Sequence, residues 1–448
     1  MIDRRKVSLC HQIFVLTLVL GGPAALGSRS AQALAGDWPL WRFDASRRAS
    51  SEEELPESLK LQWAIQLPEP TPAWPTTQKK LQFDNKYEPI LGEGLLFISS
   101  MRHDCVTAFD SETGEERWRF YGDGPFRLAP AYWKGRVIAG CDDGHVYCLS
   151  AQKGELLWKF RAGASGRRLL GNQRMINTWP VRGAPVIYDD TLYVGAGIWP
   201  FMGVFLHALN PEDGSVIWTN SGSGSDFLTQ QHNSPAFAGV APQGYIAATK
   251  DRLIVSGGRT LPAVYDRKTG KYVHYNVASR RMGSKGGGGY TVVCGENFYI
   301  NSGGMYRMDN GKWVLNVDAP VFSQYSMIAV DGSGGLLGYR HGFHEEKFRD
   351  KKGKEQTRTV VKKSWSGFLE EKIQELFIKS GSRVYGLGSG NRVLAIDLPR
   401  LDRGSRISWS TKLEGKPVSL ITGNSRLFVV TDKARLYCYG EAEVKPNL

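Results

Sequence analysis

Short apolar runs separated by turn residues repeat along this chain, and the pattern is clearest from Phe109 to Phe160. Four β-prone runs follow one another there, FRLAPAYW, RVIAGC, HVYCLS and ELLWKF. The turn signals Lys134-Gly135, Asp142-Asp143-Gly144 and Gln152-Lys153-Gly154 separate them. The pattern predicts a meander of four short strands, which is one blade of a β-propeller.

An aromatic residue marks the outermost strand of each copy of this unit. Trp118 and Trp158 stand four residues after Gly114 and Gly154, and the two tryptophans lie 40 residues apart. That spacing suits a four-stranded blade. The same position recurs with decreasing fidelity, at Trp63, Trp118, Trp158, Trp218, His274, Trp313, Trp365 and Trp409. Eight anchors predict eight blades.

The last copy contains only three strands, PVSLITG, SRLFVV and ARLYCYG, before the chain ends. The run LQWAIQL, Leu61 to Leu67, has the pattern of an outer strand but precedes the first inner strand. A closed ring removes exposed sheet edges. The sequence therefore predicts an all-β, eight-bladed propeller of four-stranded antiparallel blades over residues 61–440, with the last blade completed by this N-terminal strand.

The start of the chain is typical of an export signal. Arg4, Arg5 and Lys6 precede the apolar run from Ile13 to Leu20, and small-residue cleavage patterns follow. The apolar run is shorter than the ~20 residues of a membrane span. We expect a signal over residues 1–35, cleaved after general or twin-arginine export, and a periplasmic or extracellular protein. Residues 36–60 would then form an arm packed against the ring, and residues 441–448 a tail.

The chain is basic, with a formal net charge of +13 from mostly scattered Lys and Arg residues. A basic surface attracts polyanions, but an exported protein rarely meets nucleic acid, which we exclude as a partner. The charged run from His341 to Lys363, HGFHEEKFRDKKGKEQTRTVVKK, interrupts one copy of the repeat. We expect a solvated insertion there, and a binding arm is the alternative.

The cysteines give no sign of a disulfide framework or a metal site. After removal of the signal an odd number remains, without close spacing: Cys105, Cys141, Cys148, Cys294 and Cys438. The chain has no CxxC, no haem-attachment sequence and no spaced Cys/His set for zinc. We expect these cysteines to be core residues, and we assign no metal site.

The runs Phe109 to Gly114, followed by Trp118, and Tyr265 to Gly270 resemble the tryptophan-docking repeat of the pyrroloquinoline-quinone-like (PQQ-like) propellers. That group includes the quinoprotein alcohol dehydrogenases and the non-catalytic outer-membrane assembly lipoprotein of the BamB type. The resemblance covers most of the chain after residue 61, and Trp38 to Asp44 is similar to the opening of exported bacterial members. It implies a propeller whose outer strands are each pinned to the next blade.

The resemblance leaves two classes of function open. Quinoprotein dehydrogenases of this group carry two adjacent cysteines over the cofactor and acidic residues that serve calcium and base catalysis. This chain has no Cys-Cys pair, and spacing alone assigns such a role to none of its acids. The assembly lipoprotein carries a lipidation cysteine, whereas Cys10 lies ahead of the apolar run.

We therefore expect a non-catalytic binding or scaffold protein with no assigned cofactor. The alternative is a PQQ-dependent alcohol or sugar dehydrogenase with PQQ and calcium as cofactors. A third reading, an enzyme or binder acting on acidic polysaccharide, is motivated by the basic charge and the aromatic residues.

The long connections should gather on one rim of the ring. Links between the second and third strands of a blade emerge on the same side as links between blades, and three insertions belong to these classes: Gly163–Trp179, Ser221–Asn233 and Ile198–Gly203. We also expect His341 on this rim. The candidate ligand-binding residues there are Arg102, His103, Trp199, Phe201, His232, Asn233 and Arg259.

Each candidate also has a purely structural alternative. Trp199 and Phe201 would cover a neighbouring blade, His232 and Asn233 would cap a turn, and Arg259 would pair with a nearby acid. If the rim binds an anionic or aromatic ligand, Arg259 supplies a forked donor and Trp199 a stacking surface. We expect a protein, a small molecule or a polyanion as the partner, at the periphery of the cell envelope. The sequence does not determine the oligomeric state.

The cleavage patterns lead to a first prediction, that the mature protein begins between Gln32 and Gly36. Mass spectrometry of the exported protein measures this directly. Soluble protein that retains Met1 would contradict it.

Overall fold

The computed structural model describes residues 36–229, 234–237, 239–258, 260–275, 288–400 and 404–444. The expected export signal, with Cys10, and residues 445–448 of the expected tail lie outside the described residues. In the part of the chain that is described, no helix is long and apolar enough to cross a membrane. The helices in that part are single 3-10 turns: η1 (Lys79–Leu81), η2 (Pro200–Met202), η3 (Ser223–Ser225) and η5 (Ser389–Asn391).

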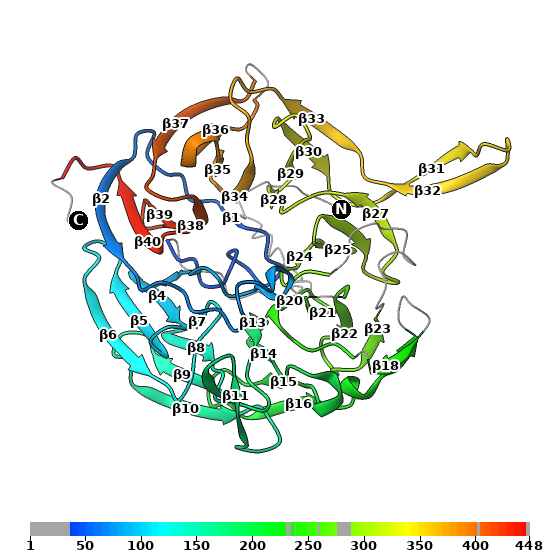
Figure 1. Cartoon of the computed structure of the whole chain (residues 1–448). Helices are drawn as coiled ribbons and strands as arrows, with labels where there is room; N and C mark the ends of the chain where they lie inside the picture. The colour runs from blue at the N-terminus through cyan, green and yellow to red at the C-terminus, as the bar shows by residue number, and fades with distance from the viewer. Residues whose placement is uncertain are drawn as a thin grey trace, which may run out of the picture.

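Eight sheets surround a central axis as the blades of a β-propeller (Figure 1). The four main strands of each blade are antiparallel and follow one another from the axis outward. The predicted fold class is confirmed, including the number of blades and the N-terminal strand that completes the last one. We number the blades in chain order from the first inner strand.

The strand bounds of the first four blades are as follows. Blade 1 contains β3 (Ile90–Gly92), β4 (Leu95–Ser100), β5 (Cys105–Asp110) and β6 (Glu116–Tyr121). Blade 2 contains β7 (Ala131–Trp133), β8 (Arg136–Gly140), β9 (His145–Ser150) and β10 (Leu156–Arg161). Blade 3 contains β13 (Gly183–Tyr188), β14 (Thr191–Ala196), β15 (Phe205–Leu209) and β16 (Val216–Asn220). Blade 4 contains β20 (Ala247–Ala248), β21 (Arg252–Val255), β22 (Ala263–Asp266) and β23 (Tyr272–His274).

The remaining blades repeat this order. Blade 5 contains β24 (Val293–Cys294), β25 (Phe298–Asn301), β26 (Gly304–Arg307) and β27 (Trp313–Asn316). Blade 6 contains β28 (Val321–Phe322), β29 (Ser326–Val330), β30 (Leu336–Arg340) and β33 (Lys363–Gly367). Blade 7 contains β34 (Glu375–Ser380), β35 (Arg383–Leu387), β36 (Arg392–Asp397) and β37 (Arg406–Lys412). Blade 8 contains β38 (Pro417–Gly423), β39 (Arg426–Thr431), β40 (Arg435–Gly440) and β2 (Lys60–Gln66).

Further strands lie outside this scheme. β1 (Ser50–Ser51) pairs in parallel with β34, and β19 (Gly244–Tyr245) pairs in parallel with β13. Three hairpins stand apart from the blades: β11 (Arg168–Gly171) with β12 (Arg174–Asn177), β17 (Phe227–Thr229) with β18 (Pro235–Phe237), and β31 (His344–Arg349) with β32 (Glu355–Val360).

Burial follows the position of a strand within its blade. Every residue of β4 is buried, because neighbouring blades cover both faces of the second strand. The outer strand β6 alternates between exposed and half-buried residues, and Trp118 and Phe120 are on its inward face. The hydrophobic core is therefore a set of apolar layers between adjacent blades.

Tryptophans of the outer strands join adjacent blades. The indole Nε1–H of Trp118 donates to the carbonyl of Ala151 in blade 2 at 2.8 Å, and that of Trp158 donates to the carbonyl of Pro211 in blade 3 at 3.1 Å. Gly154, with a φ of 70°, lies beneath the Trp118 ring, where a Cβ would approach it to 2.6 Å. Only glycine combines this left-handed conformation with so close an approach.

The predicted anchors all lie in outer strands, but they do not all make this contact. His274 follows the pattern, since its Nε2 lies 2.9 Å from the carbonyl oxygen of Met308 in blade 5. Trp313 departs from it and donates to Oδ1 of Asn316 in its own strand. Trp365 lies against Gly338 of its own blade. The departures lie in blades 5 and 6, and blade 6 contains the charged insertion that interrupts the repeat.

β2 closes the ring. It pairs along its length with β40, with Trp63 opposite Cys438. The Trp63 side chain is 2% exposed, and its Nε1–H donates to the carbonyl of Ser111 in blade 1 at 3.3 Å. The first strand of the ring thus completes blade 8 and docks it onto blade 1.

The N-terminal arm closes one mouth of the axis. Its carbonyls accept hydrogen bonds from backbone N–H groups at the far ends of five inner strands, in the pairs Tyr132–Pro39, Ala248–Ala45, Cys294–Ser46, Phe322–Arg48 and Lys379–Ala49. The fully buried guanidinium of Arg47 donates to the carbonyls of Trp41, Pro185 and Ile246. The arm therefore ties blades 1 to 7 together, since Arg47 reaches Pro185 of blade 3 and Trp38 also bridges to Leu91 of blade 1.

Residues 68–89, which we call the crossing segment, cover the opposite mouth between β2 and β3. The carbonyl of Thr71 accepts from Arg127, and the carbonyl of Lys80 accepts from the Tyr290 hydroxyl at 3.1 Å. Lys86 donates to the carbonyl of Val418 in blade 8 at 2.9 Å. The segment thus spans from blade 2 to blade 5 and returns to blade 8.

The charged insertion is an ordered element and not an unstructured loop. Residues 344–360 form the β31–β32 hairpin, which projects from blade 6 away from the ring (Figure 1). Its strands carry paired charges, including Lys347 with Glu355 and Arg358 with Glu346, both at 2.9 Å. Alternating opposite charges across the two strands favour pairing without an apolar core.

The closure leads to a second prediction, that Trp63→Ala destabilises the protein by ~3–5 kcal/mol, the usual cost of removing a buried indole. Urea unfolding of both proteins measures it.

Trp313→Ala is the matched control, because this half-buried indole donates within its own strand. It should lower stability by less. A loss below about 1 kcal/mol for Trp63→Ala would show that ring closure does not depend on this side chain.

Candidate recognition rim and axial chamber

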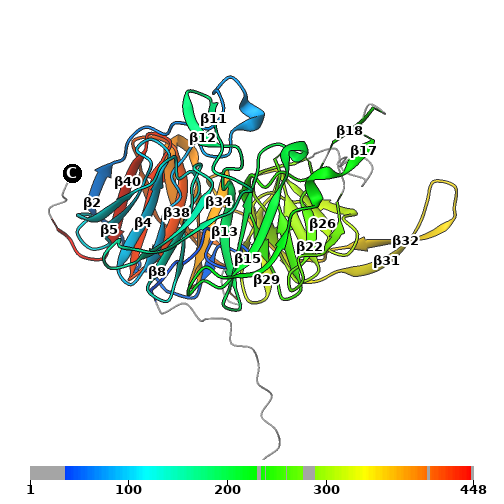
Figure 2. The same ribbon diagram turned by 90° about the horizontal axis from the view of Figure 1, so that it is seen from below.

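The loop-rich rim is the face of the ring that carries the β11–β12 and β17–β18 hairpins and the crossing segment (Figure 2). The link from 197 to 204 between β14 and β15 belongs to the same side, because second-to-third links and inter-blade links emerge together. The described parts of the three long insertions therefore lie on one rim, as the sequence predicted.

Trp199 and Phe201 are presented by this link. Their rings are nearly parallel with centroids 6.3 Å apart, and the side chains are 45% and 63% exposed. The edge of Trp74 from the crossing segment meets Trp199 at 5.8 Å. Nearby, the Trp179 indole donates to the carbonyl of Met202 at 2.8 Å, which holds the link in place. Trp199 therefore contacts a covering segment, while Phe201 remains open to solvent.

Arg102 and His103 lie in the turn between β4 and β5 on the same rim. The β11–β12 hairpin connects this turn to the Trp199 link. Arg174 pairs with Asp104 and donates to the carbonyl of Arg102 at 3.5 Å, while Asn172 at the hairpin turn donates to the carbonyl of Pro72 at 3.2 Å. The hairpin, the crossing segment and the link thus form one continuous surface.

Four other residues were predicted to lie on this rim, and the structure does not place any of them there. His232, Asn233 and Arg259 lie outside the described residues, so the joint binding of a ligand by Arg259 and Trp199 stays a prediction. The placement of His341 on this rim is wrong. Its Nε2 lies 3.0 Å from the carbonyl oxygen of Ser323, in the turn between the first and second strands of blade 6. His341 follows the third strand, so it belongs to the opposite rim.

Four apolar side chains of the loop-rich rim were not predicted from the sequence. Both hairpins expose them, with 71% of Leu170, 52% of Met175, 59% of Phe227 and 54% of Phe237 accessible. The rings of Phe227 and Phe237 meet edge to face at 5.2 Å. The available signal was their position in insertions between blades, where no core explains an apolar residue. Together with Trp199 and Phe201 they form what we call the apolar rim set.

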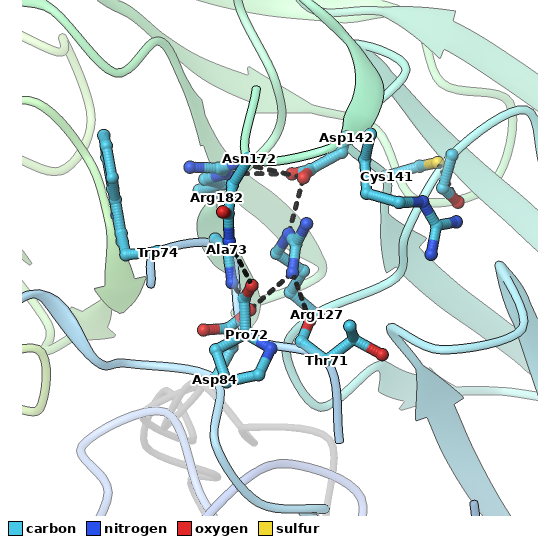
Figure 3. A network of polar contacts seen from close by, with 12 residues as sticks. Thr71, Pro72, Ala73, Trp74, Asp84, Arg127, Cys141, Asp142, Asn172 and Arg182 are labelled. Carbon is cyan, nitrogen blue, oxygen red and sulfur yellow. Dashed lines mark hydrogen bonds and ion pairs between the residues drawn. The ribbon is translucent and has the colours of Figure 1, made fainter. Parts of the chain in front are cut away.

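A buried ionic network lies beneath this surface (Figure 3). Arg127 donates from Nη1 to Asp84 at 2.6 Å and from Nε to Asp142 at 2.5 Å. Arg182 makes a two-pronged contact with Asp142 at 2.9 and 2.8 Å. All four side chains are at most 3% exposed. Because Asp84 belongs to the crossing segment, the network fastens that segment to blades 2 and 3.

The two carboxylates of the network differ in their electrostatic environment. Burial alone would raise the pKa of Asp142, but Arg127 and Arg182 together hold it below its usual value. Burial raises the pKa of Asp84 in spite of Arg127, and its Oδ1 has no hydrogen-bond partner. Asp142 is thus the ionised carboxylate that neutralises the two buried guanidiniums. From the sequence, Asp142 was predicted only as a turn residue, because its partners Arg127 and Arg182 are distant in the chain.

An axial chamber of about 160 Å³ lies between the arm and the crossing segment. Arg42 of the arm and Lys86 and Glu88 of the crossing segment line it, with Asp318 and Glu375 from the ring. Lys86 pairs with Glu88 at 2.8 Å, and the Ser419 hydroxyl donates to Glu88. Burial lowers the pKa of Arg42 to about 10 and raises that of Glu375.

The chamber does not fit the quinone and calcium of the dehydrogenase alternative. Sites for small organic ligands have volumes of roughly 300–1,000 Å³, and this chamber is smaller. Its carboxylate Glu88 is already bonded to Lys86 and Ser419. In the ranges that the structure describes, no three His, Cys, Asp or Glu side chains are grouped so as to hold a metal ion.

The network leads to a third prediction, that Asp142→Asn destabilises the protein by ~3–5 kcal/mol, because two buried guanidiniums lose their shared carboxylate. Since the folded-state pKa of Asp142 is depressed, its contribution is present above the unfolded value of about 3.9 and is lost as the pH falls below it. Urea unfolding at neutral and at acidic pH measures both effects.

The variant should show the larger deficit at neutral pH and converge towards wild type in acid. Asp213→Asn, at an exposed turn, is the control and should leave the unfolding midpoint unchanged at neutral pH. An equal deficit at both pH values would contradict the charge-based explanation.

A family model and two relatives match parts of this chain. The PQQ_2 family model, described as "Outer membrane protein assembly factor BamB", matches residues 35–310 and 205–443. The protein of that name from Yersinia pestis is 25% identical over 254 residues, which cover 54% of this chain and 56% of that protein. The dehydrogenase subunit of a quinone alcohol dehydrogenase from Gluconacetobacter polyoxogenes is 28% identical over 142 residues, 29% of this chain and 19% of that subunit. The matches therefore span about half or less of these relatives.

Solved structures resemble the chain in fold alone. A europium-containing methanol dehydrogenase aligns with a TM-score of 0.52 at 12% identity, covering 91% of this chain and 98% of that one. A quinohemoprotein alcohol dehydrogenase from Comamonas testosteroni aligns with a TM-score of 0.51 at 14% identity, covering 92% of this chain and 82% of that one. With the docked outer strands and the family match along nearly its whole described length, the chain belongs to the PQQ-like β-propeller family whose model is described as outer membrane protein assembly factor BamB.

Proposed function

We propose that this protein is an exported, non-catalytic binding or scaffold protein that recognises a partner protein with its loop-rich rim. The observation that carries the proposal is the apolar rim set, in which six large apolar side chains on hairpins and a link outside the blade core are 45–71% exposed. Exposed apolar residues that gather on one face are characteristic of interaction sites.

The composition of the rim suits protein recognition. Trp199, Phe201 and the pair Phe227 and Phe237 are aromatic, and aromatic side chains are the usual anchors of protein interfaces. Arg167 and Arg168 are exposed beside Leu170 on the β11–β12 hairpin. A partner with apolar residues bordered by acidic ones would match this surface.

Contacts within the protein hold the segments of the rim in place, which favours a surface that is formed before a partner binds. The hairpin is held by Arg174 and Asn172, the link by Trp179, and the crossing segment by the buried ionic network. A surface held in its binding conformation loses less conformational freedom on association. These contacts support recognition by the rim without large rearrangement.

Export rests on the basic and apolar start of the chain and on family membership. Arg4, Arg5 and Lys6 before a short apolar run are typical of a signal sequence. The name of the Yersinia pestis relative refers to the outer membrane. Both support a location outside the cytoplasm.

A quinone-dependent dehydrogenase is the alternative function. Its support is the similarity of part of the chain to the Gluconacetobacter polyoxogenes dehydrogenase subunit. The small axial chamber and the two segments that cover the mouths of the axis argue against it. We therefore place the function on the rim and not on the axis.

The proposal leads to a fourth prediction for protein carrying a photo-crosslinking amino acid at Leu170 in cells. We expect a discrete adduct with one partner. Replacing both Trp199 and Phe201 by Ser should lower the adduct yield about tenfold, equivalent to ~1.4 kcal/mol of binding energy. The melting temperature should stay unchanged, because both side chains are largely outside the blade core.

The crosslinker at Ile217, an exposed position of the outer strand β16, is the control and should give no such adduct. An undiminished adduct in the double variant would contradict the rim. Incubation with PQQ and calcium tests the alternative, since a bound cofactor at a hundredfold excess over its Kd would stabilise the protein by ~2.7 kcal/mol. A bound chromophore with such stabilisation would overturn the non-catalytic assignment.

A further inference from the structure

A second surface lies on blade 6, on the rim opposite the apolar rim set. An open groove of about 480 Å³ runs between the turn from β28 to β29 and the base of the β31–β32 hairpin. Its lining includes Tyr325, Ser326, Arg340, His341 and Trp365.

The turn that forms one wall of the groove is rigidly held. The Ser323 hydroxyl accepts hydrogen bonds from the backbone N–H groups of Tyr325 and Ser326, at 3.3 and 2.9 Å. The Ser323 carbonyl lies 3.0 Å from Nε2 of His341, whose ring stacks on Phe322. This fixed turn presents the Tyr325 ring, which is 78% exposed. The ring therefore projects into solvent from a preformed support.

Trp365 supplies a second aromatic surface. It lies opposite Gly338 in the pairing of β33 with β30, and a Cβ at Gly338 would be 2.2 Å from Cε2 of the indole. The missing side chain lets the indole lie flat against the neighbouring strand. Two aromatic groups, one fixed by a turn and one by a sheet, thus line the same groove.

The groove also carries unneutralised positive charge. Arg340, which lines the groove, is exposed, and Lys362 and Lys363 are exposed where the chain enters β33, outside the lining. Among the residues that the structure describes, no acidic side chain forms an ion pair with these three. The neighbouring hairpin differs, because its Lys347 and Arg358 are paired with glutamates. The Arg340 guanidinium in the groove therefore remains available to a ligand.

We propose that this groove binds an acidic saccharide containing a uronic acid. The guanidinium of Arg340 would hold the carboxylate through two parallel hydrogen bonds. The Tyr325 and Trp365 rings would pack against the C–H faces of sugar rings. The Gln324 amide, which also lines the groove, can donate to and accept from sugar hydroxyls.

The shape of the groove favours a saccharide over a compact anion. A phosphate ion needs clustered donors, whereas the lining of this groove combines one guanidinium with two aromatic groups. An extended ligand with both a charged group and rings with apolar faces uses all of these features. This site is independent of the proposed rim partner, because it lies on the opposite side of the ring.

Calorimetric titration with trigalacturonic acid and with its fully methyl-esterified form tests this inference on the full-length mature protein. The acid should bind, and the ester, which keeps the rings but lacks the charge, should bind about tenfold more weakly or not at all. Arg340→Gln and Tyr325→Ala should each weaken binding of the acid about tenfold. Arg349→Gln, a matched loss of charge elsewhere on the hairpin, should leave the affinity unchanged.

Competition with inorganic triphosphate identifies a nonspecific anion site. Weak competition supports the inference, whereas displacement of the saccharide at equal concentration overturns it. Equal affinity for acid and ester would also overturn it, and so would full affinity in Arg340→Gln. Melting temperatures of the variants should match wild type, and loss of binding with a lowered melting temperature in both would assign these residues to the fold and not to a site.

Discussion

The structure depends on the joining of its first and last blades. A propeller blade exposes apolar surface on both faces, so each needs a neighbour, and the last must meet the first. Here β2 provides the connection by pairing with β40 while Trp63 docks on Ser111 and Gly114 of blade 1. One short strand thus covers the edge of β40 and completes one interblade layer. Outer-strand indoles such as those of Trp118 and Trp158 join other neighbouring blades in the same way.

The two segments on either side of β2 determine which surfaces of the ring are available. The arm before β2 lies across the ends of the inner strands, and the crossing segment after it covers the other mouth of the axis. Their contacts enclose a small charged chamber instead of an open channel. The ionic network of Arg127, Arg182 and their two carboxylates secures the crossing segment. Recognition is consequently expected on the rims.

The rims differ in chemistry because different kinds of connection form them. Links between blades and between second and third strands carry Trp199, Phe201 and the two hairpins, which gives an extended and largely apolar surface. On the other rim, the turn at Ser323 and the base of the β31–β32 hairpin place aromatic rings beside an unpaired cation. A single ring can thereby present two unlike binding surfaces without coupling them through the axis.

The sequence alone determined the features that depend on local order along the chain. A glycine turn followed by an aromatic residue four positions later marks four of the outer strands, and four further tryptophans in outer-strand patterns brought the predicted number of blades to eight. The closing role of Leu61 to Leu67 followed from the missing strand of the last copy. The candidates Trp199 and Phe201 were found because they interrupt the repeat.

Only the tertiary structure decided how residues distant in the chain come together. It joined Asp84 to Arg127 and Asp142, placed the arm across seven inner strands and moved His341 to the opposite rim. It also folded the charged insertion into a hairpin. These features had no signature in spacing, because ion pairs between remote segments and the side on which a loop emerges depend on the closed ring and not on neighbouring residues.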